Sequence, residues 1–150
     1  MTYQHASQAS VVINKPIAEV FALLNDLGQL ADWTPFVKMD PTTTYSVNDV
    51  RSGVGAVYSW SGKRMGKGTQ TIVAVTDPTE IHSKMTFGAK ATADTSYILT
   101  PVSEGTSVAW VMSGDRSLGD QILGFLFLDK MMSKNFANGL SDLKALLESR

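Results

Sequence analysis

Asp129 is the residue of this chain whose type and position most favour chemistry. It lies in the middle of an apolar stretch, with phenylalanines before it and methionines after it. A carboxylate that faces an apolar cavity resists ionisation, so it could act as a general acid or base or hold a ligand hydroxyl. A small rotation of its helix would instead place it in solvent or in an ion pair, where most acidic side chains lie. Tyr97 is a second candidate for moving a proton.

The two histidines, His5 and His82, have no partners at the spacing that metal binding or catalysis needs. The chain has no cysteine, which removes thiolate nucleophiles, disulfides and cysteine-based zinc sites. We therefore expect no histidine-based triad and no metal site. His82 is expected to be a solvated strand residue.

The loop from Gly62 to Thr69 has the glycines and basic residues of a phosphate-binding loop but not its spacing. The spacing is one residue short, Gly68 stands where serine or threonine is needed, and a β-branched strand follows in place of a helix. The Gly53-Val54-Gly55 string precedes a strand, so it does not match a dinucleotide fingerprint either. We expect a basic hairpin tip at Gly62 to Thr69, and no cofactor.

The composition indicates one globular domain over residues 1–150, with 43% hydrophobic and 18% charged residues. The formal net charge of −1 provides no field that would attract nucleic acid or an anionic membrane. No window approaches the roughly 20 apolar residues that a membrane span needs. We therefore expect a cytoplasmic protein with no nucleic-acid partner and no integral membrane segment.

The elements that position these residues begin with a strand over Ala9 to Asn14, where three β-branched residues follow one another. Pro16 suits the first turn of a helix, and apolar residues at helical spacing extend this helix to about Leu27. A helical turn is expected over Leu30 to Trp33, because Pro35 disfavours helix at the residue before it.

From Val37 onward the pattern changes to short strands separated by turn residues. The expected strands are Val37 to Thr44, Ala56 to Ser61, Gly68 to Thr76, Ile81 to Phe87, Ala93 to Pro101 and Thr106 to Gly114. Consecutive hairpins of this kind form an antiparallel meander. The expected edge strand Val37 to Thr44 carries small polar residues and proline, which disfavour pairing with another chain. We therefore expect a monomer or weak homodimer.

Ser117 to Arg150 is the only long segment whose apolar residues recur at helical spacing. Because it follows the strands, we expect it to cover the sheet as an amphipathic lid, and such a lid often encloses a space. The residues close to its apolar face are Ile122, Leu126, Asp129, Phe136, Leu140, Leu143 and Leu147.

Large aromatic and methionine side chains fall on the expected inner face of the sheet and on the lid. The residues expected to line a ligand cavity are Trp33, Phe36, Tyr58, Trp60, Met85, Phe87, Tyr97, Trp110, Met112, Asp129, Met132 and Phe136. Such polarisable groups are typical of apolar pockets. They would equally fill a solid core, and only open volume distinguishes the two cases.

Several local strings, in this order, are similar to those of a known superfamily. They are Pro16 to Phe21, Leu30 to Phe36, Gly53 to Trp60, Thr106 to Gly114, and Leu128 to Met132 with Phe136, Gly139, Leu140 and Leu143. The chain resembles the START-like, pollen-allergen-like helix-grip superfamily (SRPBCC), in its polyketide cyclase/dehydrase and lipid-transport branch. The resemblance implies an α+β helix-grip fold. In this fold a curved antiparallel β-sheet wraps around a long C-terminal helix, with two short helices near the N-terminus.

The resemblance also implies a cavity between the sheet and the helix, and two functions follow. The first is binding of a small hydrophobic ligand, such as a lipid, a polyketide or a similar metabolite, without changing it. The alternative is a polyketide cyclase/dehydratase-type enzyme in which Asp129 or Tyr97 transfers a proton. The sequence leaves the choice between carrier and enzyme open.

Overall fold

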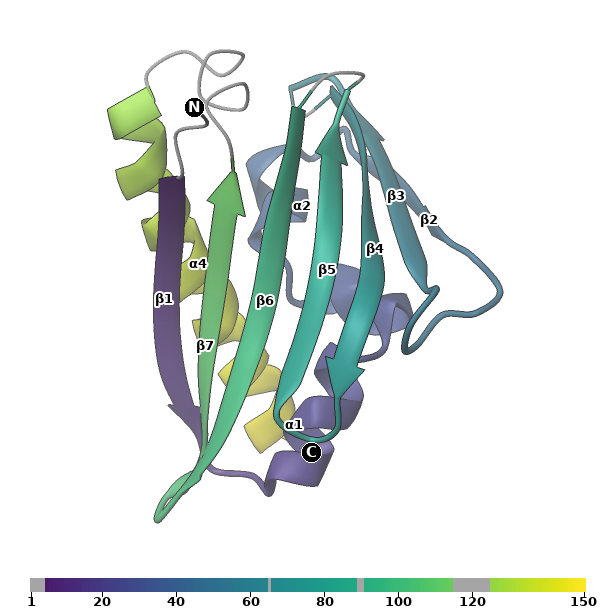
Figure 1. The fold of residues 1–150 in the computed structure, drawn as a ribbon. Helices are drawn as coiled ribbons and strands as arrows, with labels where there is room; N and C mark the ends of the chain where they lie inside the picture. The colour runs from purple at the N-terminus through teal and green to yellow at the C-terminus, as the bar shows by residue number, and fades with distance from the viewer. Residues whose placement is uncertain (1–4, 65, 89–90, 115–124) are drawn as a thin grey trace.

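The computed structural model describes residues 5–64, 66–88, 91–114 and 125–150. Its strands are β1 (His5–Ile13), β2 (Thr44–Val47), β3 (Val57–Gly62), β4 (Gly66–Thr76), β5 (Glu80–Phe87), β6 (Ala91–Val102) and β7 (Gly105–Gly114). The helices are α1 (Ile17–Leu24), the 3₁₀ helix η1 (Leu27–Asp32), α2 (Pro35–Met39) and α4 (Phe125–Glu148). Within these residues the strands form one antiparallel sheet in the order β1-β7-β6-β5-β4-β3-β2 (Figure 1).

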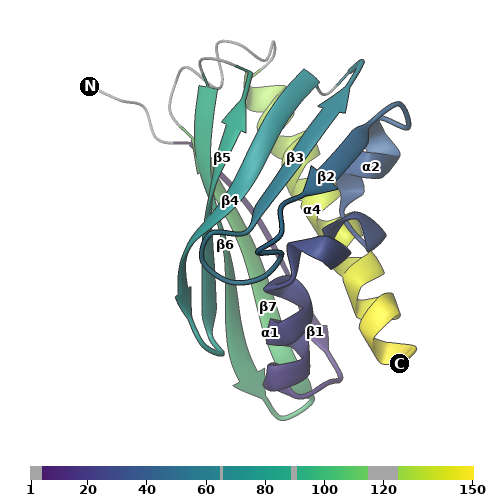
Figure 2. The same ribbon diagram turned by 90° about the vertical axis from the view of Figure 1, so that its right-hand side faces the viewer.

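The inner face of the sheet follows from strict alternation along the strands. In β7 every second residue is buried, which places Val108, Trp110 and Met112 on one face. The register then sets Tyr97 of β6 beside Trp110 and Leu99 beside Val108, so the neighbouring strands contribute to the same apolar surface. Helices α1, α2 and α4 all lie on this side of the sheet (Figure 2).

Helix α4 covers the inner face through the apolar stripe that the sequence indicates. Among the α4 residues whose side chains are described, the buried hydrophobic ones are Phe136, Leu140, Leu143 and Leu147. Phe136 stacks on Trp110 of β7, with ring centroids 4.0 Å apart and planes 9° apart. The expected start of this helix at Ser117, together with Ile122, lies outside the described residues. Of the helices that are described, none is both long enough and apolar enough to cross a bilayer.

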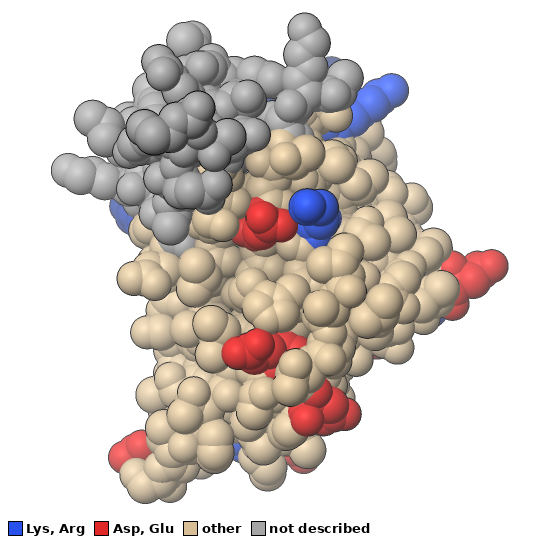
Figure 3. All heavy atoms as spheres, in the orientation of Figure 1, with Lys and Arg blue, Asp and Glu red and all other residues tan. Residues whose placement is uncertain are grey.

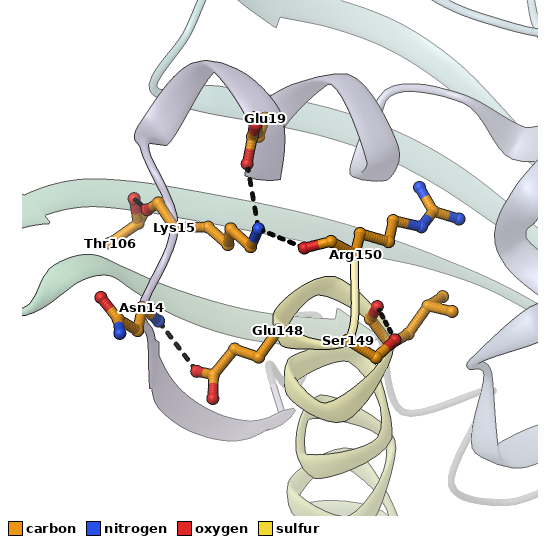
Figure 4. Close-up of polar contacts among 8 residues, drawn as sticks. Asn14, Lys15, Glu19, Thr106, Glu148, Ser149 and Arg150 are labelled. Atoms are coloured by element: carbon orange, nitrogen blue, oxygen red, sulfur yellow. Dashed lines mark hydrogen bonds and ion pairs between the residues drawn. The ribbon is translucent and has the colours of Figure 1, made fainter.

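The C-terminal end of α4 is fastened to the turn between β1 and α1 (Figure 4). The backbone N–H of Asn14 donates to Glu148 Oε2 at 2.9 Å, and Lys15 Nζ donates to the carbonyl oxygen of Arg150 at 2.8 Å. Lys15 also lies 3.9 Å from Glu19 Oε2, in the first turn of α1. These contacts join segments that are far apart in the sequence and fix the end of α4 where β1 ends.

The expected strand over Val37 to Thr44 is wrong. Pro35 begins α2, because a proline at the first helical position loses no hydrogen bond. The edge strand β2 starts only at Thr44 and runs to Val47, paired with β3. Between them, Asp40 accepts a hydrogen bond from the backbone N–H of Thr42 and turns the chain.

The first helix is also shorter than expected, since α1 ends at Leu24. Asp26 accepts a hydrogen bond from the backbone N–H of Gly28 at 2.8 Å and so begins η1 as a separate element. The remaining strands match their expected ranges to within a few residues. The architecture is therefore the α+β helix-grip fold that the sequence predicts, with a curved sheet against a long C-terminal helix.

Candidate ligand-binding site

A pocket lies between the β3–β5 part of the sheet and the segment that carries η1 and α2. The residues around it are Leu30, Thr34, Val37, Thr43, Tyr58, Trp60, Gln70, Met85 and Phe87. The sheet supplies its wall as two rows across three strands. In one row Tyr58, Gln70 and Met85 lie side by side, and in the next row Trp60 and Phe87 flank Gly68.

Gly68 gives the second row its shape. A Cβ atom at this position would overlap the ring of Trp60 and the carbonyl oxygen of Thr86. Because glycine has no side chain, the Trp60 indole lies across β4 and reaches Phe87, with ring centroids 5.7 Å apart in an edge-on arrangement. Gly68 therefore allows an aromatic ring to form the floor of the pocket.

Asp40 holds the opposite wall in place. This fully buried carboxylate accepts hydrogen bonds from the backbone N–H and the hydroxyl of Thr42, and from the backbone N–H of Arg64 at 2.8 Å. Thr42 in turn accepts a hydrogen bond from the backbone N–H of Lys63 at 2.9 Å. The segment that carries Thr43 is thereby tied to the hairpin between β3 and β4.

Helix α2 is held against α4 by two contacts of different kinds. Lys38 Nζ donates to Asp142 Oδ2 at 2.7 Å, and both side chains are exposed. Gly139 of α4 lies close to the Pro35 ring, since a Cβ atom on Gly139 would be 2.7 Å from Pro35 Cδ. An exposed ion pair contributes only about 0–1 kcal/mol, so the Lys38–Asp142 contact by itself holds α2 only weakly.

The space between the two walls is small, about 20 Å³. That is room for about one water molecule, whereas pockets for drug-sized ligands have roughly 300–1,000 Å³. The walls therefore have to separate before a larger molecule can enter.

Polar atoms without partners distinguish this site from an ordinary apolar core. Five polar side-chain atoms on or near the inner face are buried and have no hydrogen-bond partner among the described residues. They are Trp33 Nε1, Trp60 Nε1, Gln70 Nε2, Ser83 Oγ and Tyr97 Oη. A buried polar group left unpaired costs about 1–3 kcal/mol. Such groups are rare in native proteins, and each of them needs an explanation.

The indole N–H of Trp110, unlike those of Trp33 and Trp60, has a hydrogen-bond partner among the described residues. Its Nε1 donates to Thr95 Oγ1 at 2.8 Å, on the neighbouring strand. Gln70, Ser83 and Tyr97 lie on three successive strands of the same face, where the register makes them diagonal neighbours. The middle of the inner face is therefore polar, although its surroundings are aromatic and aliphatic.

Both inner-face tyrosines are neutral phenols at physiological pH. Burial, with a smaller contribution from the neighbouring Tyr45, raises the pKa of Tyr58 from 10.0 to about 12. Burial also raises the pKa of Tyr97 well above its usual value. Gln70 acts against this rise, although its amide does not meet the Tyr97 hydroxyl in hydrogen-bond geometry. Tyr97 can thus donate a hydrogen bond at neutral pH but is a poor base.

These raised pKa values predict a loss of stability in alkali. A phenol that ionises near pH 10 in the unfolded chain, but only near pH 12 or above in the fold, stabilises the fold fully below about pH 10. This contribution falls as the pH rises from about 10 through 12. Urea unfolding at pH 8, 10 and 11 should show a smaller loss of stability for Tyr97→Phe than for the unaltered protein. Equal losses of stability in the two proteins would contradict the raised pKa of Tyr97.

The structure brings together only some of the residues expected to line a cavity. Tyr58, Trp60, Met85 and Phe87 border the pocket. Five others are buried in the adjoining core, namely Trp33, Tyr97, Trp110, Met112 and Phe136. The side chains of Phe36, Asp129 and Met132 lie outside the described part of the structure, so their roles remain predictions.

Gln70 is a polar residue that lies on the inner face and borders the pocket. It is two residues before Ile72, which is fully buried, so period-two alternation along β4 places both on the inner face. Glutamine is mostly found on solvent-exposed surfaces, so its residue type gives no indication of this position. Val37 and Thr43 were missed for another reason, because their segment was expected to be an edge strand.

His82 has partners that sequence spacing did not reveal. Its Nδ1 lies 2.7 Å from Ser96 Oγ and its Nε2 lies 3.0 Å from Glu80 Oε2, so a serine, an imidazole and a carboxylate form a chain. This chain lies on the outer face of the sheet, where charged side chains are few (Figure 3). The surrounding backbone N–H groups belong to strands paired on both sides, so none is free to stabilise an oxyanion. We interpret it as a cross-strand structural network.

A curved antiparallel sheet that closes on a long C-terminal helix, with a pocket on its inner face, defines the helix-grip class of proteins. The chain belongs to the polyketide cyclase/dehydrase and lipid-transport family, whose family model matches residues 4–148. No curated protein matches the chain.

Several solved structures share the fold. Protein CV1439 from Chromobacterium violaceum is 19% identical, with a TM-score of 0.71 over 95% of this chain and 97% of that chain. DynU16, from the dynemicin biosynthetic locus, is 14% identical, with a TM-score of 0.68 over 95% of this chain and 47% of that chain. Ara h 8.0201 is 14% identical, with a TM-score of 0.64 over 99% of this chain and 100% of that chain. At these identities the likeness establishes the fold alone.

Proposed function

We propose that this protein binds a small hydrophobic molecule between the inner face of its sheet and the α2 segment, and holds it without changing it. The observation that carries the proposal is the composition of the sheet wall. Aromatic and methionine side chains surround buried polar atoms that have no partner in the described residues. Apolar walls with a few convergent polar groups are typical of small-molecule sites. Membership of a family named for polyketide cyclases and lipid transport supports the same proposal.

The small volume of the pocket indicates which wall has to move. The sheet wall is formed by strands β3, β4 and β5, each hydrogen-bonded to neighbours on both sides. The opposite wall depends on α2, a helix of five residues held to α4 in part by an exposed ion pair. Because that ion pair is weak, displacement of α2 costs less than opening the sheet. We propose that a ligand enters by displacing α2.

A bulky residue at the pocket mouth should block binding. Val37 lines the pocket from α2 and is partly exposed, so Val37→Trp would fill the mouth at little cost to the core. The neutral fluorescent probe N-phenyl-1-naphthylamine should bind the unaltered protein saturably. Its affinity should fall about tenfold or more in Val37→Trp, equivalent to roughly 1.4 kcal/mol or more of lost binding free energy.

Val54→Trp is the matched control, because Val54 is 61% exposed and does not line the pocket. It introduces the same side chain on the surface and should leave probe binding unchanged. Circular dichroism of both variants verifies that the fold is intact. An equal effect of the two substitutions, or no saturable binding to the unaltered protein, would refute the proposed site.

The enzyme alternative has no comparable observation in its favour. Tyr97 stays protonated at neutral pH because burial raises its pKa, so it is unsuited to accepting a proton. In the part of the chain that the structure describes, the nine residues around the pocket include no carboxylate and no imidazole. The side chain of Asp129 lies outside the described residues. Binding without chemistry is therefore the function we propose.

A further inference from the structure

Two of the unpaired polar atoms belong to the pocket wall itself. Trp60 is 9% exposed and Gln70 is 4% exposed, and neither Trp60 Nε1 nor Gln70 Nε2 has a partner among the described residues. An indole N–H can only donate a hydrogen bond. These two positions are diagonal neighbours on β3 and β4, a separation that long side chains can bridge. The wall thus offers two neighbouring donors to whatever occupies the pocket.

The charge of the pocket restricts the occupant. Among the described residues, none of the nine that surround the pocket has a charged side chain. An ionised group buried here would lose its hydration without gaining a counter-charge, which is strongly unfavourable. A group that only donates, such as a protonated amine, would also leave both wall donors unpaired. The group that lies against the wall is therefore neutral and accepts hydrogen bonds.

The rings of the wall restrict the shape of the occupant. Trp60 lies between Phe87 and Tyr58, with ring centroids 5.7 Å and 6.2 Å away. A planar molecule can pack against such rings in stacked or edge-on geometry, which adds about 0.5–1.5 kcal/mol to the burial of its area. A flexible alkyl chain would gain only the burial.

We infer that the ligand is a neutral planar molecule with a carbonyl-type oxygen that accepts hydrogen bonds from Trp60 Nε1 and Gln70 Nε2. This inference rests on the proposed function, since it specifies what the same pocket selects. A carbonyl oxygen has two lone pairs and can accept from both donors. Ser83 and Tyr97 extend the polar strip behind Gln70 with hydroxyls that both donate and accept. A second oxygen on the ligand would meet these hydroxyls.

Three naphthalenes of matched size test the inference. They are 2-acetylnaphthalene, which has a carbonyl acceptor, 2-ethylnaphthalene, which lacks it, and the anion 2-naphthoate. Isothermal titration calorimetry of the full chain should show the ketone binding about tenfold more tightly than the hydrocarbon, and the anion binding most weakly. Trp60→Phe keeps an aromatic ring but removes the donor, and Gln70→Met keeps the length of the side chain without its amide. Each variant should lower the ratio of ketone affinity to hydrocarbon affinity about fivefold, because both compounds lose the same apolar contacts but only the ketone loses a hydrogen bond.

The outcomes separate this inference from the function on which it rests. Equal affinity for ketone and hydrocarbon would overturn the donor assignment while leaving the pocket as an apolar binding site. Tightest binding of 2-naphthoate would overturn the neutral character of the ligand. If none of the three compounds binds to the unaltered protein, the proposed function itself fails. Loss of binding to both ketone and hydrocarbon in Gln70→Met would show that Gln70 shapes the pocket and does not select the ligand.

Discussion

Phe136→Ala is expected to lower the free energy of unfolding by about 3–5 kcal/mol, the usual cost of removing a buried phenylalanine ring. Phe136 is fully buried and stacks on Trp110, with ring centroids 4.0 Å apart. Trp110 in turn contacts the rings of Trp33 and Tyr97, at centroid distances of 5.5 Å and 5.6 Å. Phe136 therefore joins α4 to an aromatic cluster on the sheet and on the segment before α2. Urea unfolding followed by circular dichroism measures the loss.

Phe136→Leu is the control for this prediction. Leucine retains much of the buried volume and the apolar character, so its cost should stay below roughly 1.5 kcal/mol. A Phe136→Ala variant that loses no more stability than Phe136→Leu would mean that the ring does not anchor α4. Far-UV circular dichroism in the absence of urea shows whether each variant still contains the native secondary structure.

The parts of the fold that could be predicted are those in which burial is one-sided. Strand β7 alternates buried and less buried residues along its whole length, so its expected range, Thr106 to Gly114, differs from the observed one by one residue. The apolar stripe of α4 from Phe136 to Leu147 is equally regular, and its members are buried as expected. A periodic pattern on one face is fixed by the sequence and needs no tertiary information.

The segment from Val37 to Thr44 was predicted wrongly because tertiary contacts decide its conformation. Its β-branched residues favour a strand, and local preference alone could not overrule them. The carboxylate of Asp40 is bonded to the backbone N–H of Arg64, 24 residues further along the chain. No local window contains that contact. Pro35, which suits the first turn of a helix, and Pro41, which cannot donate to a strand ladder, are the local signs against a strand.

The candidate site, like the fold, could be predicted from the sequence only in part. Alternation along the strands predicts that Tyr58, Trp60, Met85 and Phe87 face inward, and these four side chains border the pocket. Their contact with a ligand stays a prediction. Alternation could not show that Gln70 and Trp60 have unpaired polar atoms, because pairing depends on where every neighbouring side chain lies. It could not give the volume of the pocket either. That volume depends on how closely α2 approaches the sheet, and it decides whether aromatic residues form a core or a cavity.

Asp40→Ala is the second substitution with a large expected effect, a loss of about 3 kcal/mol in the free energy of unfolding. It deprives the backbone N–H of Thr42, the Thr42 hydroxyl and the backbone N–H of Arg64 of their acceptor. Hydrogen bonds to a charged acceptor contribute about 1.5–3 kcal/mol each, and donors left buried without a partner add to the cost. Solvent that reaches the opened turn recovers part of this loss, so the sum of the three bonds is not expected. Urea unfolding at neutral pH gives the value.

Asp142→Ala provides the matched control, because the same substitution removes the other ionic anchor of this wall. The carboxylate of Asp142 is exposed and pairs with Lys38, so Asp142→Ala should lower the free energy of unfolding by less than about 1 kcal/mol. The two variants also differ in their expected effect on binding. Asp40→Ala frees the side of the wall that carries Thr43, whereas Asp142→Ala releases only α2 from α4. If the two substitutions cost the same, the buried carboxylate does not organise the wall, and the pocket depends on helix packing alone.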